Sequence, residues 1–306
     1  TRSTEFGAEL GLFGNRVHLD VAVYNTNSIN QILPVKTSAS SEYTTQILNA
    51  GKINNKGLEI QLDLVPVDLK SFKWNIGLNY AINKSEVKIL DDAGKLTSFE
   101  IASSGTTQVL ASVGQAYGTL YGSAYLRDGD GNIVVDSKGL PVKDSQNKIL
   151  GHYTPKWTGG LSNTFTYKNI ELSALIDASI GGKIYSGTNR TGVYTGVLKS
   201  TLPGRDADHG GLYYYVDGSS KVLAPDGISP NGQTVYEDGI IVNGVTADGQ
   251  KNTTIASAED YYKSLYNISE AFTYKASYIK FREIKVTYTF ARSLVKKIGL
   301  EGASVS

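Results

Sequence analysis

Two segments with a regular alternation of apolar and polar residues lie on either side of a two-residue reversal, Lys168-Asn169. Their apolar members are Leu161, Phe165 and Tyr167 before the reversal and Leu172, Ala174, Ile176, Ala178 and Ile180 after it; their polar members are Ser162, Thr164, Thr166, Glu171, Ser173, Asp177 and Ser179. Leu175 is the one exception. Side chains of a strand point alternately to its two faces, so this period of two predicts an antiparallel hairpin with one apolar and one polar face. Such a hairpin suits a wall between lipid and water, and it also suits a soluble β-sandwich.

The same design occurs twice more toward the N-terminus. Residues 5–13 and 16–24 alternate around a reversal at Gly14-Asn15, and residues 58–64 and 74–82 alternate around a turn within residues 66–71. The polar positions of these strands carry side chains such as His18 and Asp20, which fit an aqueous lumen better than lipid. The pattern therefore predicts at least three hairpins of one kind.

Short and long connections alternate along the chain. Residues 25–55 are rich in Ser, Thr and Asn and are expected to form a polar excursion, and residues 187–275 are expected to form a long loop before the next comparable strand. A sandwich gives no reason for loop lengths to segregate to two ends, whereas outer-membrane barrels have short periplasmic turns and long external loops. The pattern favours about eight to ten antiparallel strands in a transmembrane β-barrel wall, with Gly14-Asn15 and Lys168-Asn169 on the periplasmic side.

The alternation also assigns the two faces of this wall. The residues expected to face lipid are Leu19, Val21, Ile60, Leu62, Leu78 and Ile176. The residues expected to face the lumen are Asp20, Glu59, Gln61, Asn79 and Asp177.

Composition excludes several other classes. Charged residues make up 19% of the 306 residues and the net charge is +1, which gives no general attraction to nucleic acid. The chain has 33 Gly and 20 Tyr residues and no Cys, so many turns and aromatic belts fit it, and a thiolate metal site or a cysteine nucleophile does not. It contains no apolar run long enough for a transmembrane helix, although alternating strands escape that criterion.

Several motifs resemble one known family when they are taken in order. They are AELGLFGNRVHLDVAVYNTNS, NAGKINNKGLEIQLDL, GQAYGTLYG, DGDGNIVVDSKG, LGHYTPKWTGGLSNTFTYKNIELSALIDASIGGKIYS and ASYIKFREIKVTYTF. Each motif is weak alone, but together they cover nearly the whole chain. In this order they resemble the C-terminal barrel half of SusC-like (RagA/SusC-type) TonB-dependent outer-membrane transporters.

The resemblance implies an all-β fold in which residues 1–306 form a partial arc of a barrel of about 22 strands. It implies a location in the Gram-negative outer membrane, contact with its lipid, and import of oligosaccharides or peptides. The partners implied are a SusD-like surface lipoprotein and TonB, acting through a plug domain that residues 1–306 lack together with the TonB box. No residue would perform bond chemistry, so no enzyme activity or obligatory cofactor is expected. A secreted β-sandwich that binds or cleaves glycans remains the alternative.

One loop has the residue types of a calcium site. Asp128, Asp130, Asn132 and Asp136 occupy positions one, three, five and nine of such a loop, but Ile133 stands where Gly is required and Gly139 where Glu is required. The alternative is a plain Asp-Gly turn. The three histidines, His18, His152 and His209, are too far apart in sequence for a zinc motif.

Tyrosines cluster in the expected long loop. Tyr213, Tyr214 and Tyr215 are consecutive, and Tyr261 and Tyr262 follow later. Tyrosine offers rigid, amphipathic contact area, so these residues are the candidates for stacking on a substrate or packing on a partner. The alternative is that they pack within the loop or form an interfacial belt.

Overall fold

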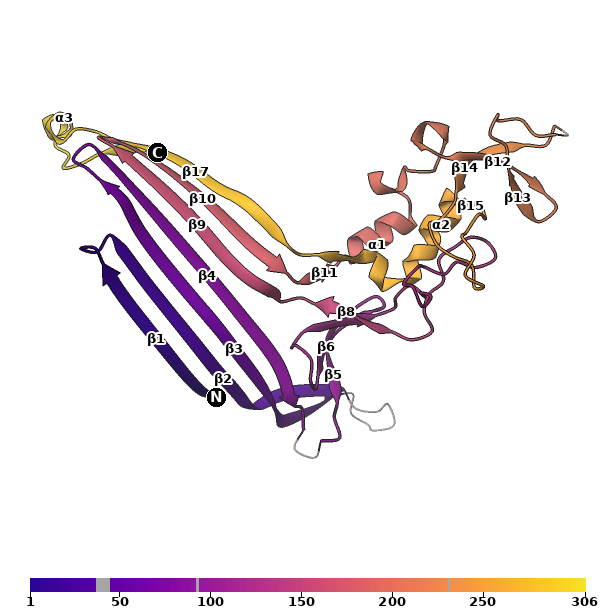
Figure 1. The fold of residues 1–306 in the computed structure, drawn as a ribbon, viewed down its shortest axis with the longest axis horizontal. Coiled ribbons are helices and arrows are strands. Elements are labelled where there is room, and N and C mark those ends of the chain that lie inside the picture. Colours follow the sequence, from indigo (N-terminus) through magenta and orange to yellow (C-terminus); the bar gives the residue numbers. More distant parts are fainter. Residues whose placement is uncertain (37–44, 92–93, 231) are drawn as a thin grey trace.

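The computed structural model describes residues 1–36, 45–91, 94–230 and 232–306. Its central element is an eight-stranded antiparallel sheet in the order β1-β2-β3-β4-β9-β10-β17-β18, called the wall below (Figure 1). Its strands are β1 Arg2–Leu12, β2 Val17–Lys36, β3 Thr45–Asp68, β4 Phe72–Ile89, β9 Pro155–Tyr167, β10 Ile170–Gly181, β17 Tyr278–Thr289 and β18 Ser304–Val305. The predicted antiparallel all-β class is confirmed, and the strand number lies within the predicted range.

The short turns lie together at one end of the wall. The backbone amide of Lys168 donates to the carbonyl of Ser71 at 3.0 Å, which joins the β9–β10 turn to the β3–β4 turn. The side-chain amide of Asn169 donates to the carbonyl of Thr289 at 2.9 Å. In Figure 1 these turns are at the upper left, and the long connections leave the wall at its other end. The predicted segregation of loop lengths holds for the three predicted hairpins, whereas the 14-residue connection between Thr289 and Ser304 (residues 290–303) lies at the same end as the short turns.

The prediction of a polar excursion over residues 25–55 is wrong for most of that stretch. Strand β2 continues to Lys36 and β3 starts at Thr45, with Lys36 paired to Thr45, while residues 37–44 lie outside the described part. The side-chain amide of Asn54 donates to the amide oxygens of Asn25 and Asn27, at 2.6 and 3.1 Å. Polar residues follow one another in this stretch, so the sequence lacks the apolar–polar alternation that marks a strand, although the backbones of β2 and β3 remain paired.

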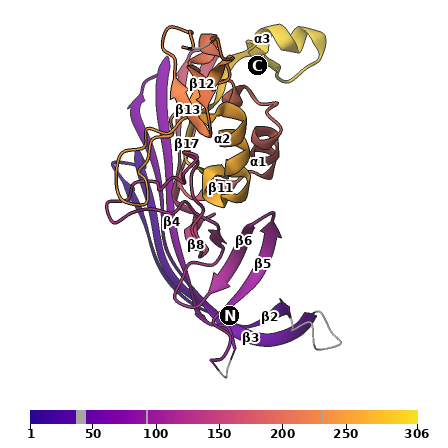
Figure 2. The same cartoon turned by 90° about the vertical axis from the view of Figure 1, so that its right-hand side faces the viewer.

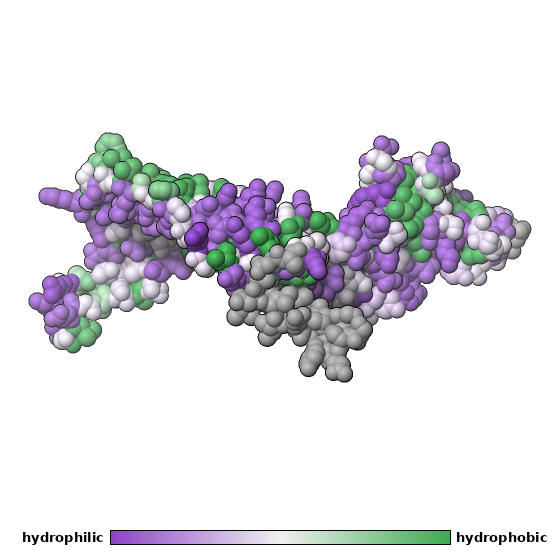
Figure 3. Space-filling view, turned by 90° about the horizontal axis from the view of Figure 1, so that it is seen from below, coloured by the Kyte–Doolittle hydropathy of each residue, from purple (hydrophilic) through white to green (hydrophobic). Residues whose placement is uncertain are grey.

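The register separates the two predicted faces. One row of cross-strand neighbours runs through Leu19, Leu62, Leu78, Leu161 and Ile176. The next row runs through Asp20, Gln61, Asn79, Gly160 and Asp177. Neighbouring rows point to opposite faces of a sheet. In Figure 3 hydrophobic side chains accordingly gather along the upper margin of the wall at the left, with hydrophilic ones below them.

The wall is an open arc. Strand β1 pairs only with β2, and the outer edge of β17 pairs with β18 only at Tyr288 and Thr289, in the part of the chain that the structure describes. Phe6 on β1 is 72% exposed and Ile279 on β17 is 70% exposed. Both edges therefore present unpaired backbone groups that further strands would cover, while Phe6 and Ile279 point to the apolar face of the wall.

Two folded excursions leave the wall on one side (Figure 2). The first excursion follows β4 and forms a sheet of β5 Ser98–Ser104, β6 Thr107–Ser112, β7 Thr119–Gly122 and β8 Lys148–His152. The second excursion follows β10 and contains β11 Lys183–Tyr185, α1 Gly187–Tyr194, η1 Lys199–Thr201, η2 Ala207–His209, β12 Leu212–Asp217, β13 Ser220–Leu223, β14 Val235–Ile240, β15 Ala256–Ser257, α2 Ala258–Ser264, η3 Leu265–Asn267, η4 Ser269–Phe272 and β16 Thr273–Lys275. The stretch 187–275, expected as a loop, is thus a folded unit. After β17 come α3 Arg292–Val295 and η5 Lys296–Ile298.

Two clusters of buried apolar residues stabilise the excursions. One joins Val87 of β4 and Leu90, directly after that strand, to Phe99 and Ala111 of the first excursion. The other is formed by Val193, Leu265 and Phe272, with Tyr125 and Tyr261 among the residues packed against it. A β-sandwich has a buried apolar core between two stacked sheets. The wall is a single sheet in the described residues, with no second sheet packed on it, so the predicted alternative of a β-sandwich is wrong. No helix among the described residues is both long and apolar enough to cross a membrane.

Candidate functional site

A pocket of about 690 Å³ lies where the two excursions meet, and we call it the tyrosine pocket. Its lining comes from four segments that are far apart in the sequence. The residues are Tyr125, Ile133, Pro141, Pro203, Gly204, His209, Gly210, Leu212, Gly239, Ile240, Ile241, Val242, Asn243, Tyr261 and Tyr262. A concave, largely apolar site with a few polar groups is the usual form of a ligand pocket.

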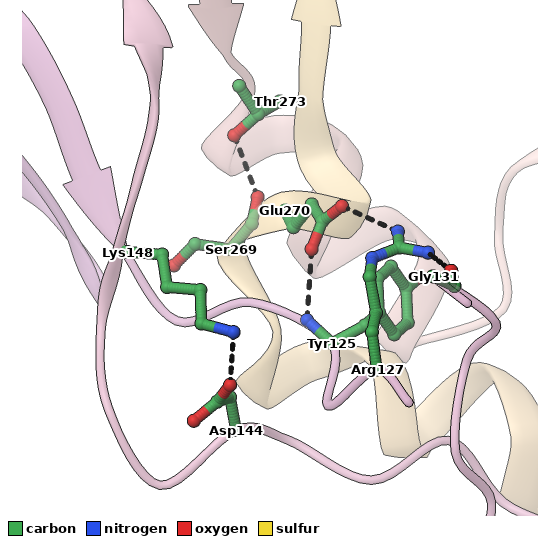
Figure 4. A network of polar contacts seen from close by, with 8 residues as sticks. All are labelled: Tyr125, Arg127, Gly131, Asp144, Lys148, Ser269, Glu270 and Thr273. Carbon is green, nitrogen blue, oxygen red and sulfur yellow. Dashed lines mark hydrogen bonds and ion pairs between the residues drawn. The ribbon is translucent and has the colours of Figure 1, made fainter. Parts of the chain in front are cut away.

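Glu270 holds Tyr125 in the wall of this pocket. One carboxylate oxygen accepts from the backbone amide of Tyr125 at 2.9 Å, and the other accepts from Nη2 of Arg127 at 2.8 Å (Figure 4). Nη1 of Arg127 donates to the carbonyl of Gly131 at 2.9 Å, and its guanidinium lies 5.8 Å from the centre of the Tyr125 ring. The first excursion is therefore fixed to the second by a bridging carboxylate.

Buried hydroxyls next to Glu270 reinforce this junction. Oγ of Ser123 accepts from the amide of Ser269 at 2.9 Å and donates to the carbonyl of Asn267 at 2.8 Å. The hydroxyls of Thr106 and Ser269 are hydrogen-bonded at 2.7 Å. Ser123 and Ser269 are almost completely buried, so a lost bond here leaves a polar group without water. These buried bonds therefore join the two excursions at this point.

Helix α2 supplies Tyr261 and Tyr262. It starts at Ala258 and is capped by Ser257, whose hydroxyl accepts from the amide of Asp260 at 3.2 Å, and acidic residues occupy its first turn, as the helix dipole favours. The hydroxyl of Tyr262 donates to the carbonyl of Pro203 at 2.8 Å, which ties the helix to the opposite wall of the pocket. The two tyrosine rings meet edge to face at 5.1 Å between centroids.

Burial raises the pKa of Tyr125, Tyr261 and Tyr262 above the ordinary tyrosine range, because a phenolate would lose hydration there. All three phenols are therefore neutral at physiological pH. They can donate and accept hydrogen bonds, and they add no charge to the pocket.

A second pocket of about 600 Å³ adjoins the first, and we call it the charged pocket. It is lined by Val193, Tyr194, Thr195, Gly196, Arg205, Asp238, Ala258, Glu259, Tyr262 and Lys263. Tyr262 lines both pockets, so the two pockets meet at this residue. Two cationic and two anionic side chains border the charged pocket, whereas no Asp, Glu, Lys or Arg is in the described lining of the tyrosine pocket.

The five predicted tyrosines do not form one surface. Tyr214 is only 4% exposed, donates to Asp238 at 3.1 Å and stacks on Tyr236, so the alternative of packing within the loop holds for it. Tyr213 and Tyr215 are its half-buried neighbours in β12 and line neither pocket. Tyr261 and Tyr262 alone among the five line the tyrosine pocket.

Sequence reasoning missed the other contributors. Tyr125 joins the pocket from the first excursion, and Arg205 and His209 join from the turns after α1. Tyr125 stands as a single tyrosine before an Asp-Gly turn, and nothing in its neighbourhood distinguishes it. Only the fold brings these segments together.

The proposed calcium loop consists of two hydrogen-bonded turns. One oxygen of Asp128 accepts from the amides of Asp130 and Asn132, at 3.0 and 2.8 Å, and Asp136 accepts from the amides of Lys138 and Leu140. The bond from the Asn132 side chain is the main cause that lowers the pKa of Asp128. The plain-turn alternative accounts for both carboxylates, and the described residues contain no cluster of three or more His, Cys, Asp or Glu placed to hold a metal. Calcium binding at these residues stays a prediction.

The three histidines are separate in space as well as in sequence. His18 lies 3.5 Å from Glu9 on the polar face of the wall, and His152 is bonded to the carbonyl of Thr154 at 2.9 Å. His209 lies at the tyrosine pocket, where its Nδ1 is 2.6 Å from a carboxylate oxygen of Asp206. That bond from His209 is the main cause that lowers the pKa of Asp206.

Comparison with known proteins gives consistent matches. A family model described as "TonB dependent receptor-like, beta-barrel" matches residues 1–226. TonB-dependent receptor P3 of Formosa agariphila is 27% identical over 212 residues, and TonB-dependent receptor SusC of Bacteroides thetaiotaomicron is 26% identical over 200 residues. These alignments cover 61% and 60% of this chain but only 21% and 20% of the relatives, so the chain spans about a fifth of their length.

The fold is also similar to a solved structure, that of the RagAB peptide transporter. The TM-score is 0.63 at 19% identity, and the match covers 99% of this chain and 30% of that chain. The predicted resemblance to SusC-like transporters is confirmed, as is the outer-membrane location. The relatives are receptors, in agreement with the expectation that the chain is not an enzyme. By its match over residues 1–226, the chain belongs to the TonB dependent receptor-like, beta-barrel family.

Proposed function

We propose that this chain forms part of the barrel of a TonB-dependent transporter that imports oligosaccharides or peptides across the outer membrane. The observation that carries the proposal is the wall, a single layer with one apolar face, one polar face and two open edges. Lipid does not tolerate an open sheet edge, so in the membrane both edges must pair with further strands. The wall is then an arc of a larger barrel whose polar face lines the lumen.

Two aromatic pairs on the apolar face support this placement. Trp74 stacks on Phe165 at 5.6 Å near the short turns, and Tyr80 lies 5.5 Å from Trp157 toward the long connections. Trp74 and Tyr80 are six positions apart on β4, about 20 Å along the strand, which a strand tilt of about 40° reduces to about 15 Å along the membrane normal, within the height of the apolar band. Transmembrane barrels carry aromatic girdles at both margins of an apolar band about 25 Å tall.

The folded excursions would stand on the external side, because the short turns of such barrels are periplasmic. The second excursion, residues 187–275, would meet a SusD-like surface lipoprotein and the substrate. TonB would act from the periplasm through a plug domain inside the barrel. Calcium is not required by this scheme.

Deletion of the β12–β13 hairpin, residues 212–223, in the whole receptor tests the role of the second excursion. We expect loss of lipoprotein co-purification or of substrate uptake while the barrel still folds. A matched control removes residues 225–228, which follow the hairpin and line neither pocket. If capping and uptake both survive the hairpin deletion, the excursion is not the partner site. If uptake continues in cells without TonB, the transporter mechanism itself is wrong.

A further inference from the structure

We infer that the tyrosine pocket and the charged pocket together bind a short peptide, with an apolar side chain in the first and charged groups of the peptide in the second. This inference rests on the proposed import function and narrows its substrate to peptides.

The lining of the tyrosine pocket favours an apolar group over a sugar. Ile133, Leu212, Ile240 and Val242 supply aliphatic surface, and the described lining contains no carboxylate or cationic side chain. A sugar that enters must find partners for each hydroxyl it removes from water, or lose free energy for each one left unpaired. An apolar side chain has no such requirement and gains from burial.

Two of the polar groups at this pocket already have partners. The hydroxyl of Tyr262 donates to the carbonyl of Pro203, and Nδ1 of His209 is bonded to Asp206. These bonds hold the side chains in place and reduce their capacity to bind several sugar hydroxyls. Because Tyr125 is fixed in turn by Glu270, the aromatic walls are rigid before a ligand arrives, which lowers the entropy cost of binding.

The charged pocket has side chains that can bind the charged groups of a peptide. Lys263 and Glu259 are paired with each other on helix α2, so Arg205 and Asp238 supply the charges that can bind a peptide. Nη2 of Arg205 donates to Oγ1 of Thr201 at 2.7 Å, and Asp238 accepts from Tyr214 at 3.1 Å, so both groups are oriented. A neutral oligosaccharide has no charge to match both signs, whereas a peptide has both through its termini or side chains.

Tyr262 lines both pockets, so one ligand that reaches past this residue can place an apolar group in the tyrosine pocket and a charged group in the charged pocket. Neighbouring residues of an extended peptide are about 3.3–3.6 Å apart along the chain, so an apolar side chain and a charged group a few residues away can occupy adjoining pockets. Tyr262 then contacts both parts of the peptide.

The test uses the whole receptor, purified in detergent, and three probes: a Gly/Ser peptide with free termini and one central Leu, the same peptide with Ser in place of Leu, and maltohexaose. We expect the Leu peptide to bind at least about tenfold more tightly than the Ser peptide, which is the range for a filled apolar pocket. Maltohexaose should bind no better than the Ser peptide. Equal binding of the two peptides, tighter binding of maltohexaose, or no binding of any probe would overturn the inference.

Substitutions locate the binding site. Ile241→Trp, in the pocket lining, should weaken binding of the Leu peptide about tenfold or more. Ile228→Trp makes the same change at a residue that is 72% exposed and lines neither pocket, and it should leave binding unchanged. Asn243→Trp places the ring at the exposed rim, so it gives a second blocking variant with less risk to folding. Full binding by both lining variants would place the site elsewhere.

The import proposal is tested separately by TonB-dependent uptake of the same probes. Uptake of maltohexaose without uptake of the Leu peptide refutes the peptide inference and leaves the transporter intact. Uptake of the Leu peptide that is independent of TonB refutes the transporter and leaves the peptide site intact.

Discussion

The carboxylate of Glu270 accepts a hydrogen bond of 2.9 Å from the backbone amide of Tyr125, which lies 145 positions earlier in the chain. The same carboxylate is paired with Arg127 at 2.8 Å. One side chain of the second excursion thereby positions a wall of the tyrosine pocket that belongs to the first excursion. These bonds of Glu270 join the two excursions, and the first prediction is the effect of removing them.

Glu270→Ala should loosen the excursions without opening the wall. It leaves the Tyr125 amide and the Arg127 guanidinium without their acceptor, and such a loss costs about 1–3 kcal/mol for a buried donor. Hydrogen exchange should accelerate at β7, β8 and η4 and stay slow at β3 and β4. Glu259→Ala is the control, because Glu259 is exposed and pairs with Lys263 on its own helix. Equal acceleration in both variants would contradict the role of Glu270.

Arginine should distinguish the two faces of the wall. Leu62→Arg places a charge on the apolar row and should lower folding stability in phospholipid vesicles by about 2–4 kcal/mol if it lies near mid-membrane. Gln61→Arg, the neighbouring residue on the polar row, should cost far less. Equilibrium unfolding in urea measures both, and equal losses would refute the assignment of the faces.

Alkaline pH should weaken the excursions before the wall. Burial raises the folded-state pKa of Tyr125, Tyr261 and Tyr262 above the unfolded value of about 10. The folded state thus favours the neutral phenols, and this stability is complete below about pH 10 and is lost as pH rises through the folded values. Tyr125→Phe should reduce the loss, as followed by hydrogen exchange at α2 between pH 9 and 11. An unchanged alkaline loss in this variant would contradict the burial of Tyr125.

Calcium should leave the loop of residues 128–139 unchanged if the turns account for its carboxylates. Adding millimolar calcium, or removing it with a chelator, should not shift the thermal midpoint of the whole receptor. Asp128→Asn keeps an acceptor oxygen for the amides of Asp130 and Asn132 and should be nearly neutral in both conditions. A calcium-dependent rise in the midpoint that Asp128→Asn abolishes would restore the metal site.

The sequence predicts the wall well because lipid and water impose opposite demands on its faces. Leu62 and Gln61 lie in neighbouring rows that point to opposite faces, as the alternation predicts. The same signal disappears in the polar extensions of β2 and β3, where Asn25 and Asn54 bond to each other and neither face is apolar.

The alternation of apolar and polar residues does not predict the tyrosine pocket. Tyr214 and Tyr213 are the same residue type at adjacent positions, yet the first is buried against Tyr236 and the second is half-buried, because β12 alternates within its own small sheet. Tyr125 reaches Tyr261 only because Glu270 and the buried serines join two excursions. Contacts between distant segments leave no local pattern in the sequence.

The central claim is that the wall spans a membrane with its Leu62 face in lipid and its Gln61 face in water. This chain has no cysteine, so Leu62→Cys and Gln61→Cys introduce single sites in it for a nitroxide label. The measurement is paramagnetic relaxation of each label by oxygen and by a water-soluble nickel chelate, in the whole receptor reconstituted in phospholipid vesicles. The account predicts that oxygen dominates at position 62 and the nickel chelate at position 61. Equal access of the nickel chelate to both positions would contradict it.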